Sequence, residues 1–360
     1  MTVLPPYAGR IAHVSDIHLT DSATEPTGLA EQRAELLELV ERLNCAAPNL
    51  WTVTGDIFGH AVPYRSTAAE RNAFADVLRA MAGQAPVIVL SGNHDGANEL
   101  DLFAKITAKW PIVVVKELSY FFVEGSGGAH FAVLALPYPS KRLLAARAAE
   151  KGIADVNAEA TEMLSDICAG YGRALADAAR DHSEMTRGRK VIPVFLAHAN
   201  VRGSTLSGVE VMAHQEPELL RHVLDEMPIA ATLLGHIHKP QRVGVRAAYA
   251  GSPRPMDFGE ENGKGGLLWI FGQPPTDAEG LDDLLGQTTV LLQHPGDELS
   301  HPDGRGLPTV TALHVRSAAR RVLTLSYAWG TEEGGEAAPR WLVEPAAPDS
   351  LPFPVLHTKR

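Results

Sequence analysis

Five short apolar segments of this chain are each followed closely by aspartate, asparagine or histidine. The segments have the length and composition of buried strands: Arg10–Val14, Leu50–Thr54, Pro86–Leu90, Val191–Ala197 and Ala230–Leu234. The polar residues that come after them are, in order, Asp16, His18, Asp56, Asn93, His94, His198, His236 and His238. Open α/β sheets place their ligand sites at the carboxyl ends of the strands. We therefore predict that these side chains meet in one site.

Segments of helical periodicity alternate with these strands. Apolar residues recur on one helical face in Glu31–Leu43, Ser66–Met81, Ala154–Glu184 and Pro217–Met227, and Ser66 is the expected N-cap of the second. Further short strands are expected at Phe131–Leu136, Gly266–Phe271, Thr309–Val315 and Arg321–Tyr327. The alternation predicts a layered α/β fold. We expect one domain over residues 1–271, an excursion with closing strands over 272–329, and a short C-terminal tail over 330–360.

The composition is that of a globular protein without membrane spans. Of the 360 residues, 45% are hydrophobic and 21% are charged, and no segment approaches the roughly 20 apolar residues of a spanning helix. The first ten residues lack the apolar run of a signal peptide, and two cysteines predict no disulfide framework. We expect a cytoplasmic location. The net charge of -11 argues against a protein that coats nucleic acid, but not against a nuclease whose bound cations meet the phosphate.

The donor types predict a metal site. Asp16 and His18 lie two residues apart, as do His236 and His238, so each pair points the same way in an extended chain. Carboxylate, imidazole and amide donors without thiolate suit manganese, iron or zinc better than calcium or a lone magnesium. Seven candidate ligands are too many for one tetrahedral ion and fit two divalent ions that share a carboxylate.

Each of these motifs also has a common structural explanation. A single histidine near a strand end is usually a surface or core residue, and an isolated Gly-Asp is usually a turn. His13, inside the first strand, is expected to be a core histidine, and Asp95 is expected to orient a histidine and not to bind metal itself. The joint occurrence of the motifs in one order, each after a buried strand, favours the metal site.

Together these motifs resemble the signature of calcineurin-like metallophosphoesterases. The resemblance spans about residues 11–251 and rests on Asp16-Ile17-His18, Gly55-Asp56, Gly92-Asn93-His94-Asp95, His198 and Gly235-His236-Ile237-His238. It implies a four-layer α/β/β/α sandwich of two mixed sheets. It also implies one metal ion bound by Asp16, His18, Asp56 and His238, and a second bound by Asp56, Asn93, His198 and His236. His94 would face the phosphate without binding metal.

The resemblance implies a mechanism for phosphodiester hydrolysis. Two ions, if bound there, would lower the pKa of a water between them and would supply hydroxide for attack on phosphorus. The ions and His94 would stabilise the charge that develops on the phosphoryl oxygens, and His94 is a candidate acid for the leaving alkoxide. Manganese is the first candidate metal, with iron and zinc as alternatives.

Three segments are similar to SbcD-type nucleases of double-strand-break repair and recombination. They are His13–Leu19 with Gly55–Phe58, His198–Ser204, and the closing segment Tyr249–Glu260, which leads to a Lys-Gly strand start. This similarity implies DNA as substrate, cut as an exonuclease or endonuclease, and Arg202, Arg254 and His60 are candidate substrate contacts. It also implies a homodimer and an SbcC-type ATPase partner, although the sequence after Leu325 lacks the helical pattern of a partner-binding segment.

Two other functions remain open at this point. A small-molecule phosphodiesterase or phosphatase acting on nucleotides would use the same metal site, and the negative net charge favours it. A non-catalytic scaffold on the same fold would be expected to have lost metal ligands, and this chain has every one.

Overall fold

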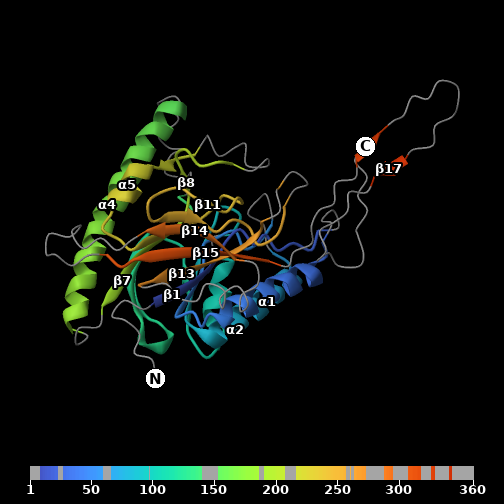
Figure 1. Ribbon diagram of the computed structural model, residues 1–360, viewed down its shortest axis with the longest axis horizontal. Coiled ribbons are helices and arrows are strands. Elements are labelled where there is room, and N and C mark those ends of the chain that lie inside the picture. Colours follow the sequence, from blue (N-terminus) through green and yellow to red (C-terminus); the bar gives the residue numbers. More distant parts are fainter. Residues whose placement is uncertain are drawn as a thin grey trace.

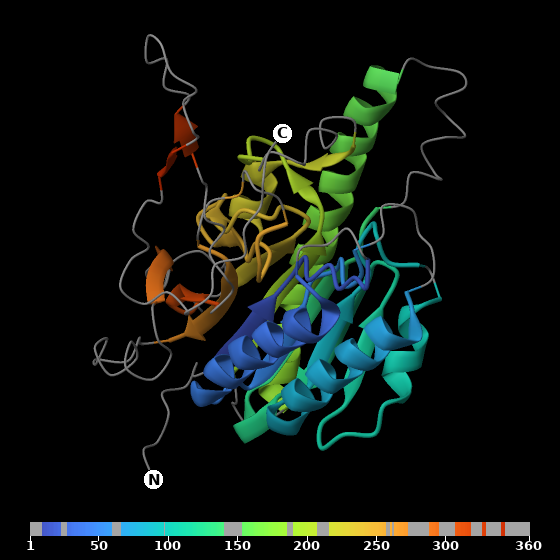
Figure 2. The ribbon, with the colours of Figure 1, turned by 90° about the vertical axis from the view of Figure 1, so that its right-hand side faces the viewer.

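The computed structural model describes most of the chain. The described residues are 9–22, 27–59, 66–96, 98–139, 153–185, 190–206, 216–256, 260, 263–272, 288–294, 307–317, 326–328 and 340–342. Within them two sheets lie face to face, with helices on the outside of each (Figures 1 and 2).

The first sheet has seven strands and mixed direction. Its order is β14 (Thr288–His294), β15 (Val310–Arg316), β13 (Gly265–Phe271), β1 (Gly9–Val14), β2 (Leu50–Val53), β3 (Val87–Leu90) and β4 (Ile112–Val115). Strands β1 to β4 are parallel, and β13 to β15 add to β1 in antiparallel fashion. The residues that follow β1, β2 and β3 therefore lie at a common edge.

The second sheet has six strands. Its order is β11 (Gln241–Arg242), β12 (Ala247–Tyr249), β10 (Ala231–Gly235), β7 (Val191–His198), β6 (His130–Leu136) and β5 (Ser119–Glu124). The four central strands are parallel, and β11 and β5 run antiparallel at the two edges. Strands β7 and β10 pair from Ala231 with Val194 to Gly235 with His198, so their carboxyl ends coincide.

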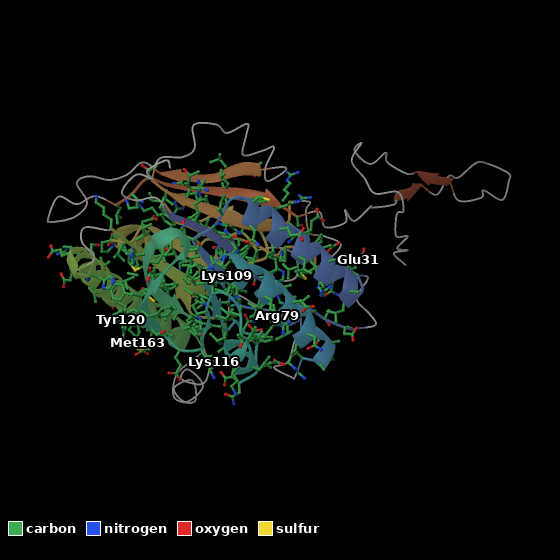
Figure 3. All side chains as sticks on the ribbon, turned by 90° about the horizontal axis from the view of Figure 1, so that it is seen from below. Glu31, Arg79, Lys109, Lys116, Tyr120 and Met163 are labelled. Carbon is green, nitrogen blue, oxygen red and sulfur yellow. The ribbon has the colours of Figure 1, made fainter. Side chains whose placement is uncertain are left out.

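Helices cover the outer face of each sheet. Helices α1 (Leu29–Cys45) and α2 (Ala68–Gln84) lie on the first sheet, and α4 (Ile153–Met185) and α5 (Arg221–Glu226) lie on the second (Figure 2). Charged side chains such as Arg79 and Lys109 lie on the outside (Figure 3). The remaining elements are η1 (Leu100–Lys105), η2 (Ser126–Gly128), the pair β8 (Asn200–Val201) and β9 (Glu218–Leu219), and the pair β16 (Ser326–Ala328) and β17 (Arg340–Leu342).

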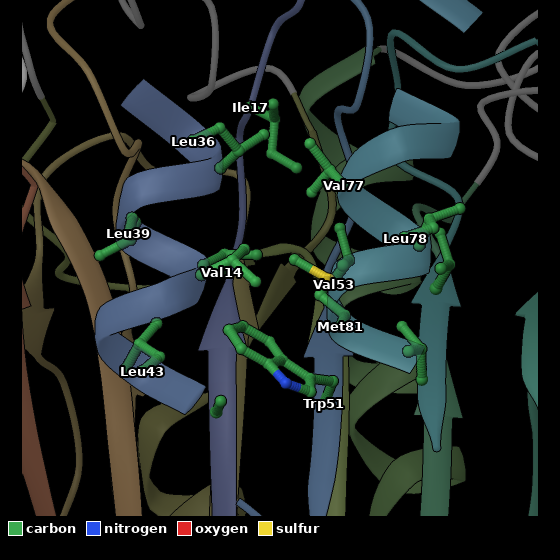
Figure 4. Close-up of a cluster of buried hydrophobic side chains, with 14 of the residues drawn as sticks. Val14, Ile17, Leu36, Leu39, Leu43, Trp51, Val53, Val77, Leu78 and Met81 are labelled. Carbon is green, nitrogen blue, oxygen red and sulfur yellow. The ribbon is translucent and has the colours of Figure 1, made fainter. Parts of the chain in front are cut away.

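Three apolar clusters join the four layers. The first packs Leu39 and Leu43 of α1 and Met81 of α2 against Val14 and Trp51 of the first sheet (Figure 4). The second lies between the sheets, and the third joins the second sheet to α4 and α5. Removing apolar surface from water contributes about 25 cal/mol of stability per Å². Because both faces of both sheets are buried in this way, the strand ends are held in place. The predicted four-layer sandwich of two mixed sheets is confirmed.

The structure differs from the sequence-based expectation at two helix starts. Thr67, and not Ser66, is the N-cap of α2, because its side chain accepts the Glu70 amide while Glu70 caps the Thr67 amide in return. Pro217–Leu220 is not helical: Glu218–Leu219 forms β9, and α5 begins at Arg221. Among the described residues, no helix is long and apolar enough to span a membrane.

Two buried histidines are expected to make the fold sensitive to acid. His13, a core residue as predicted, lies 2.8 Å from Thr54 Oγ1, and burial lowers its pKa from 6.5 to about 3. Burial, with Arg316 and Lys264 nearby, lowers the pKa of His314 from 6.5 to about 4. Because the unfolded chain takes up these protons first, stability is expected to fall as pH drops from 6.5 toward 4.

Replacing His314 by leucine should make this pH dependence shallower. Between pH 6 and 4, one histidine that is protonated only in the unfolded state lowers the free energy of unfolding by about 1.4 kcal/mol per pH unit. Urea unfolding of the wild type and of His314→Leu across this range measures the difference. Parallel curves would contradict the assigned role of His314.

Candidate metal centre

The eight predicted side chains, seven ligands and His94, converge where the two sheets meet. The loops after β1, β2 and β3 bring Asp16, His18, Asp56, Asn93 and His94 from the first sheet, and β7 and β10 bring His198, His236 and His238 from the second. Three groups have ligand atoms within 4.8 Å of one another: Asp16, His18 and His238; His18, Asp56 and His94; and Asp56, His198 and His236. The sequence-predicted convergence is therefore present in the structure.

Asp56 lies between the two halves of this cluster. Its Oδ2 atom is 3.7 Å from His18 Nε2 and 3.4 Å from His198 Nε2. Its Oδ1 atom accepts the backbone N–H of His94 at 2.9 Å. The carboxylate is buried, with 2% of its surface exposed. A carboxylate placed in this way can be shared by two cations.

Asn93 faces the second half of the cluster. Its side-chain oxygen is 3.0 Å from His198 Nε2 and 3.0 Å from His236 Nδ1. The amide oxygen and the two imidazole nitrogens thus point toward a common centre. In the first half of the cluster, His18 and His238 lie next to each other, with their ring centroids 4.9 Å apart.

Four residues of the cluster have a left-handed backbone. The φ angle is 52° at Asp16, 49° at His18, 53° at Asp56 and 102° at His236. This region is unfavourable for residues other than glycine, and it persists only where surrounding contacts impose it. The contacts are present: Asp16 N–H donates to Gly55 O, His18 N–H donates to Asp56 O, and His236 N–H donates to Asp16 Oδ1, each at 3.0 Å. Strain concentrated at these four positions supports a functional site.

Groups around the cluster orient two of the histidines. His198 Nδ1 is 2.6 Å from Thr54 O, so Nε2 is turned toward Asp56. His238 Nδ1 is 3.2 Å from Glu260 Oε1. Such partners fix which ring nitrogen is available to a metal.

Glu260 and Lys264 are site residues that the sequence reasoning did not name. Lys264 Nζ lies 2.8 Å from Glu260 Oε2 and donates to Ser252 Oγ and to His238 O. Although burial opposes ionisation of Glu260, His238 and Lys264 lower its pKa to about 2. The sequence signal for them is the closing segment, which ends at Glu260, and the Lys264-Gly265 strand start that follows it. The role of this segment becomes clear only from the contact between Glu260 and His238.

Asp95 is a structural support of the centre. Its carboxylate accepts the backbone N–H groups of Gly92 at 2.8 Å and of Ile57 at 3.0 Å. Asp95 was expected to orient a histidine; these contacts instead join the loops that carry Asp56 and Asn93. Burial, together with the nearby Asp56, raises its pKa to about 7.

The electrostatics of the cluster favour cations. Burial opposes ionisation of Asp56, yet His198 and His18 hold the pKa of that carboxyl well below its usual range. Burial lowers the pKa of His198, but Asp56 outweighs it and raises the pKa to about 9. Burial keeps the pKa of His18 low, so its ring is neutral and able to bind a metal.

The donor set fits divalent metal ions. Nε2 of His18 is buried and has no hydrogen-bond partner among the described residues, although Asp56 lies close by. Burying such an atom is unfavourable unless it binds something. Nitrogen and oxygen donors without thiolate suit manganese, iron or zinc. We therefore infer that the cluster is a site for divalent metal ions.

The three candidate substrate contacts differ in their placement. His60 lies outside the described residues. Arg202 is exposed and its Nε donates to Glu218 Oε2 at 2.9 Å. Arg254 is 5% exposed and donates to His18 O at 2.8 Å, so it supports the loop that carries His18.

Comparison with known proteins agrees with this site. The family model described as calcineurin-like phosphoesterase matches residues 9–240. The chain belongs to this family. It is a metal-dependent phosphoester hydrolase, because the phosphoesterase family match is joined by the clustered histidines and carboxylates of a metal site.

Individual relatives of this chain have low sequence identity to it. The chain is 24% identical to the SbcD subunit of nuclease SbcCD from Bacillus subtilis, over 79% of this chain and 71% of the relative. It is 26% identical to the corresponding protein of Escherichia coli, over 70% of this chain and 62% of the relative. Among solved structures, purple acid phosphatase PPD1 of yellow lupin aligns with a TM-score of 0.38 at 13% identity, over 73% of this chain and 51% of its own.

Replacing Gly92 by alanine is expected to damage the centre. The added Cβ would lie 2.1 Å from Asp56 Oδ1 and 2.3 Å from Asp56 N, so the Asp56 loop would have to move. Overpacking of this kind costs about 1–3 kcal/mol of stability, and metal binding should weaken with it. Gly83→Ala is the matched control, because nothing lies within 4 Å of its added Cβ. Urea unfolding and manganese titration of both variants test this; equal behaviour would contradict the close approach.

Proposed function

We propose that this enzyme is a DNA nuclease of the SbcD type that works with two divalent ions, manganese being the first candidate. Asp16, His18, Asp56 and His238 would hold one ion, and Asp56, Asn93, His198 and His236 would hold the other. The observation that carries the two-ion centre is the position of Asp56 between the two groups of donors, 3.7 Å from His18 and 3.4 Å from His198.

The chemistry of the site suits a phosphodiester. Two divalent ions bound there would supply hydroxide at neutral pH and neutralise charge on the phosphate. The protein contributes a preorganised set of donors on two rigid sheets, which avoids reorganisation during the reaction. Asp95, Glu260 and Lys264 hold the loops and the His238 ring in place from outside.

His94 is the proposed acid for the leaving group. It is half-buried, and its ring centroid lies 4.8 Å from that of His18. Its backbone N–H is anchored on Asp56, so the ring stands beside the cluster. A histidine in this position can stabilise a phosphoryl oxygen or protonate an alkoxide.

DNA is proposed as substrate on the strength of the relatives and the closing segment. Two relatives that are named as components of the SbcCD nuclease match 70% and 79% of this chain. The closing segment, which is similar in sequence to such nucleases, supplies Glu260 beside His238, and Lys264 follows at the strand start. A role in DNA repair or recombination would follow from this substrate.

The test is a digestion of end-labelled linear duplex DNA with manganese, run beside bis-p-nitrophenyl phosphate. Asp56→Asn is the negative control in both assays. We expect progressive shortening of the duplex that disappears in the variant. Hydrolysis of the small diester with intact DNA would reject the nuclease and favour a small-molecule phosphodiesterase, for which the net charge of -11 argues.

Partners form a separate part of the proposal. The relatives are named as components of the SbcCD nuclease, and the E. coli match spans 62% of that relative. An SbcC-type ATPase and a second copy of this chain are the candidate partners. Repeating the digestion with a purified SbcC-type ATPase and ATP tests the first, and light scattering of the purified chain tests the second.

A further inference from the structure

Two side chains outside the ligand set, Glu216 and Tyr138, lie against His236. Glu216 Oε2 is 3.3 Å from His236 Nε2. The Tyr138 phenol lies beside Glu216, and the Tyr138 ring centroid is 5.7 Å from that of His236. Tyr138 follows β6 and Glu216 precedes β9, so the pair comes from two distant segments.

Tyr138 is fixed where the two sheets meet. Its backbone N–H donates to Ser91 O at 3.0 Å, which links the loop after β6 to the residue after β3. Its ring is also 6.1 Å from His198, so it borders both histidines of the second half of the centre.

The carboxylate of Glu216 is largely shielded from solvent and lies close to Nε2 of His236. Its side chain is 12% exposed, and that of His236 is 11% exposed. The other ring nitrogen of His236, Nδ1, is 3.0 Å from Asn93 Oδ1 and faces the centre. An imidazole can bind a metal only through a nitrogen that has no proton. A carboxylate beside Nε2 favours the proton on that nitrogen, so a metal ion at the centre would replace the contact of Nδ1 with Asn93 Oδ1.

His238, two residues after His236, also has a glutamate partner, but at the other ring nitrogen. His238 meets Glu260 through Nδ1, whereas His236 meets Glu216 through Nε2. Glu260 is supported by Lys264, and the Tyr138 phenol lies beside Glu216. Each histidine of the His236-Ile237-His238 motif thus has its own carboxylate, and the two carboxylates belong to different halves of the centre.

We propose that Tyr138 and Glu216 are a positioning pair that sets the metal affinity of the half-site formed by Asp56, Asn93, His198 and His236. The pair holds the His236 ring with Nδ1 toward the centre, and it acts through His236 without binding the ion. This proposal rests on the proposed two-metal centre. It adds that the metal affinity of one half-site is set separately from that of the other.

The test is a calorimetric manganese titration with electron paramagnetic resonance of the loaded protein. Glu216→Gln keeps the shape of the side chain and removes its charge. We expect one of the two ions to bind roughly 10- to 100-fold more weakly, as is typical when the outer partner of a metal-binding histidine is lost. With enough manganese to fill both sites of the wild type, the spectrum of the variant should change from that of a coupled pair to that of a single bound ion. Tyr138→Phe should weaken the same ion by a smaller factor.

Glu218→Gln is the matched control. Glu218 lies two residues further along and pairs with the exposed Arg202, so its loss should leave both manganese affinities unchanged. Two ions bound by Glu216→Gln with wild-type affinity would overturn the positioning role, as would equal weakening of both ions. If the wild type itself binds fewer than two ions, the two-metal centre fails, and the positioning pair fails with it.

Discussion

Asp56→Asn is expected to abolish metal-dependent hydrolysis and to weaken binding of both ions. Asp56 Oδ2 lies within 3.7 Å of a histidine from each half of the centre, and Oδ1 receives the His94 amide. The change removes the negative charge that two cations would share, and it places an amide N–H₂ where an acceptor is needed. We expect hydrolysis of bis-p-nitrophenyl phosphate to fall by more than about a hundredfold, beyond the typical effect of losing an outer partner.

Asp76→Asn provides the control for this change. Asp76 is a surface carboxylate on α2 that pairs with Arg33 and Arg79, with 39% of its side chain exposed. Its loss should affect neither metal content nor rate. Circular dichroism of both variants checks that they fold. An Asp56→Asn protein that binds two ions with wild-type affinity would contradict the shared role of Asp56.

His94→Ala is expected to slow hydrolysis by about 10²- to 10⁴-fold while both ions stay bound. That range is typical for removal of a general acid or of one stabilising donor. His94 Nδ1 or Nε2 lies within 4.8 Å of ligand atoms of His18 and Asp56, so it is close enough to act on a phosphate held there. The rate is measured with the small diester, and metal content by elemental analysis.

The metal content separates two roles for His94. Loss of an ion from His94→Ala would make His94 a ligand, and an unchanged rate would remove it from the mechanism. His222→Ala is the matched control, since His222 is an exposed histidine on α5 and belongs to none of the three groups of ligand atoms. It should leave both the rate and the metal content unchanged.

Much of the centre could be predicted from the sequence because its ligands follow buried strands. The apolar runs before Asp16, Asp56 and His198 are long enough to be read as strands without any tertiary information. Parallel strands bring their carboxyl ends together, so residues far apart in sequence could be assigned to one site. The glycines before Asp56 and Asn93 are also explained: a side chain at Gly55 would meet His198, and one at Gly92 would meet Asp56.

The supporting residues could not be predicted in the same way. The roles proposed for Glu216 and Tyr138 follow from their contacts with His236. No rule of sequence spacing relates either residue to His236. The edge strands β4, β5, β11 and β14 were also not predicted. β5 has alternating exposure, and β11 is only two residues long. Strands such as β5 and β11 are specified by their pairing with a neighbour and not by a local pattern.

The most direct test of the metal centre is anomalous diffraction at the manganese edge from crystals soaked in manganese. We predict two peaks. One should lie among Asp16, His18, Asp56 and His238, and the other among Asp56, Asn93, His198 and His236. The Asp56 carboxylate should contact both. A single peak, or peaks that do not share Asp56, would contradict the two-metal centre on which the proposed mechanism depends.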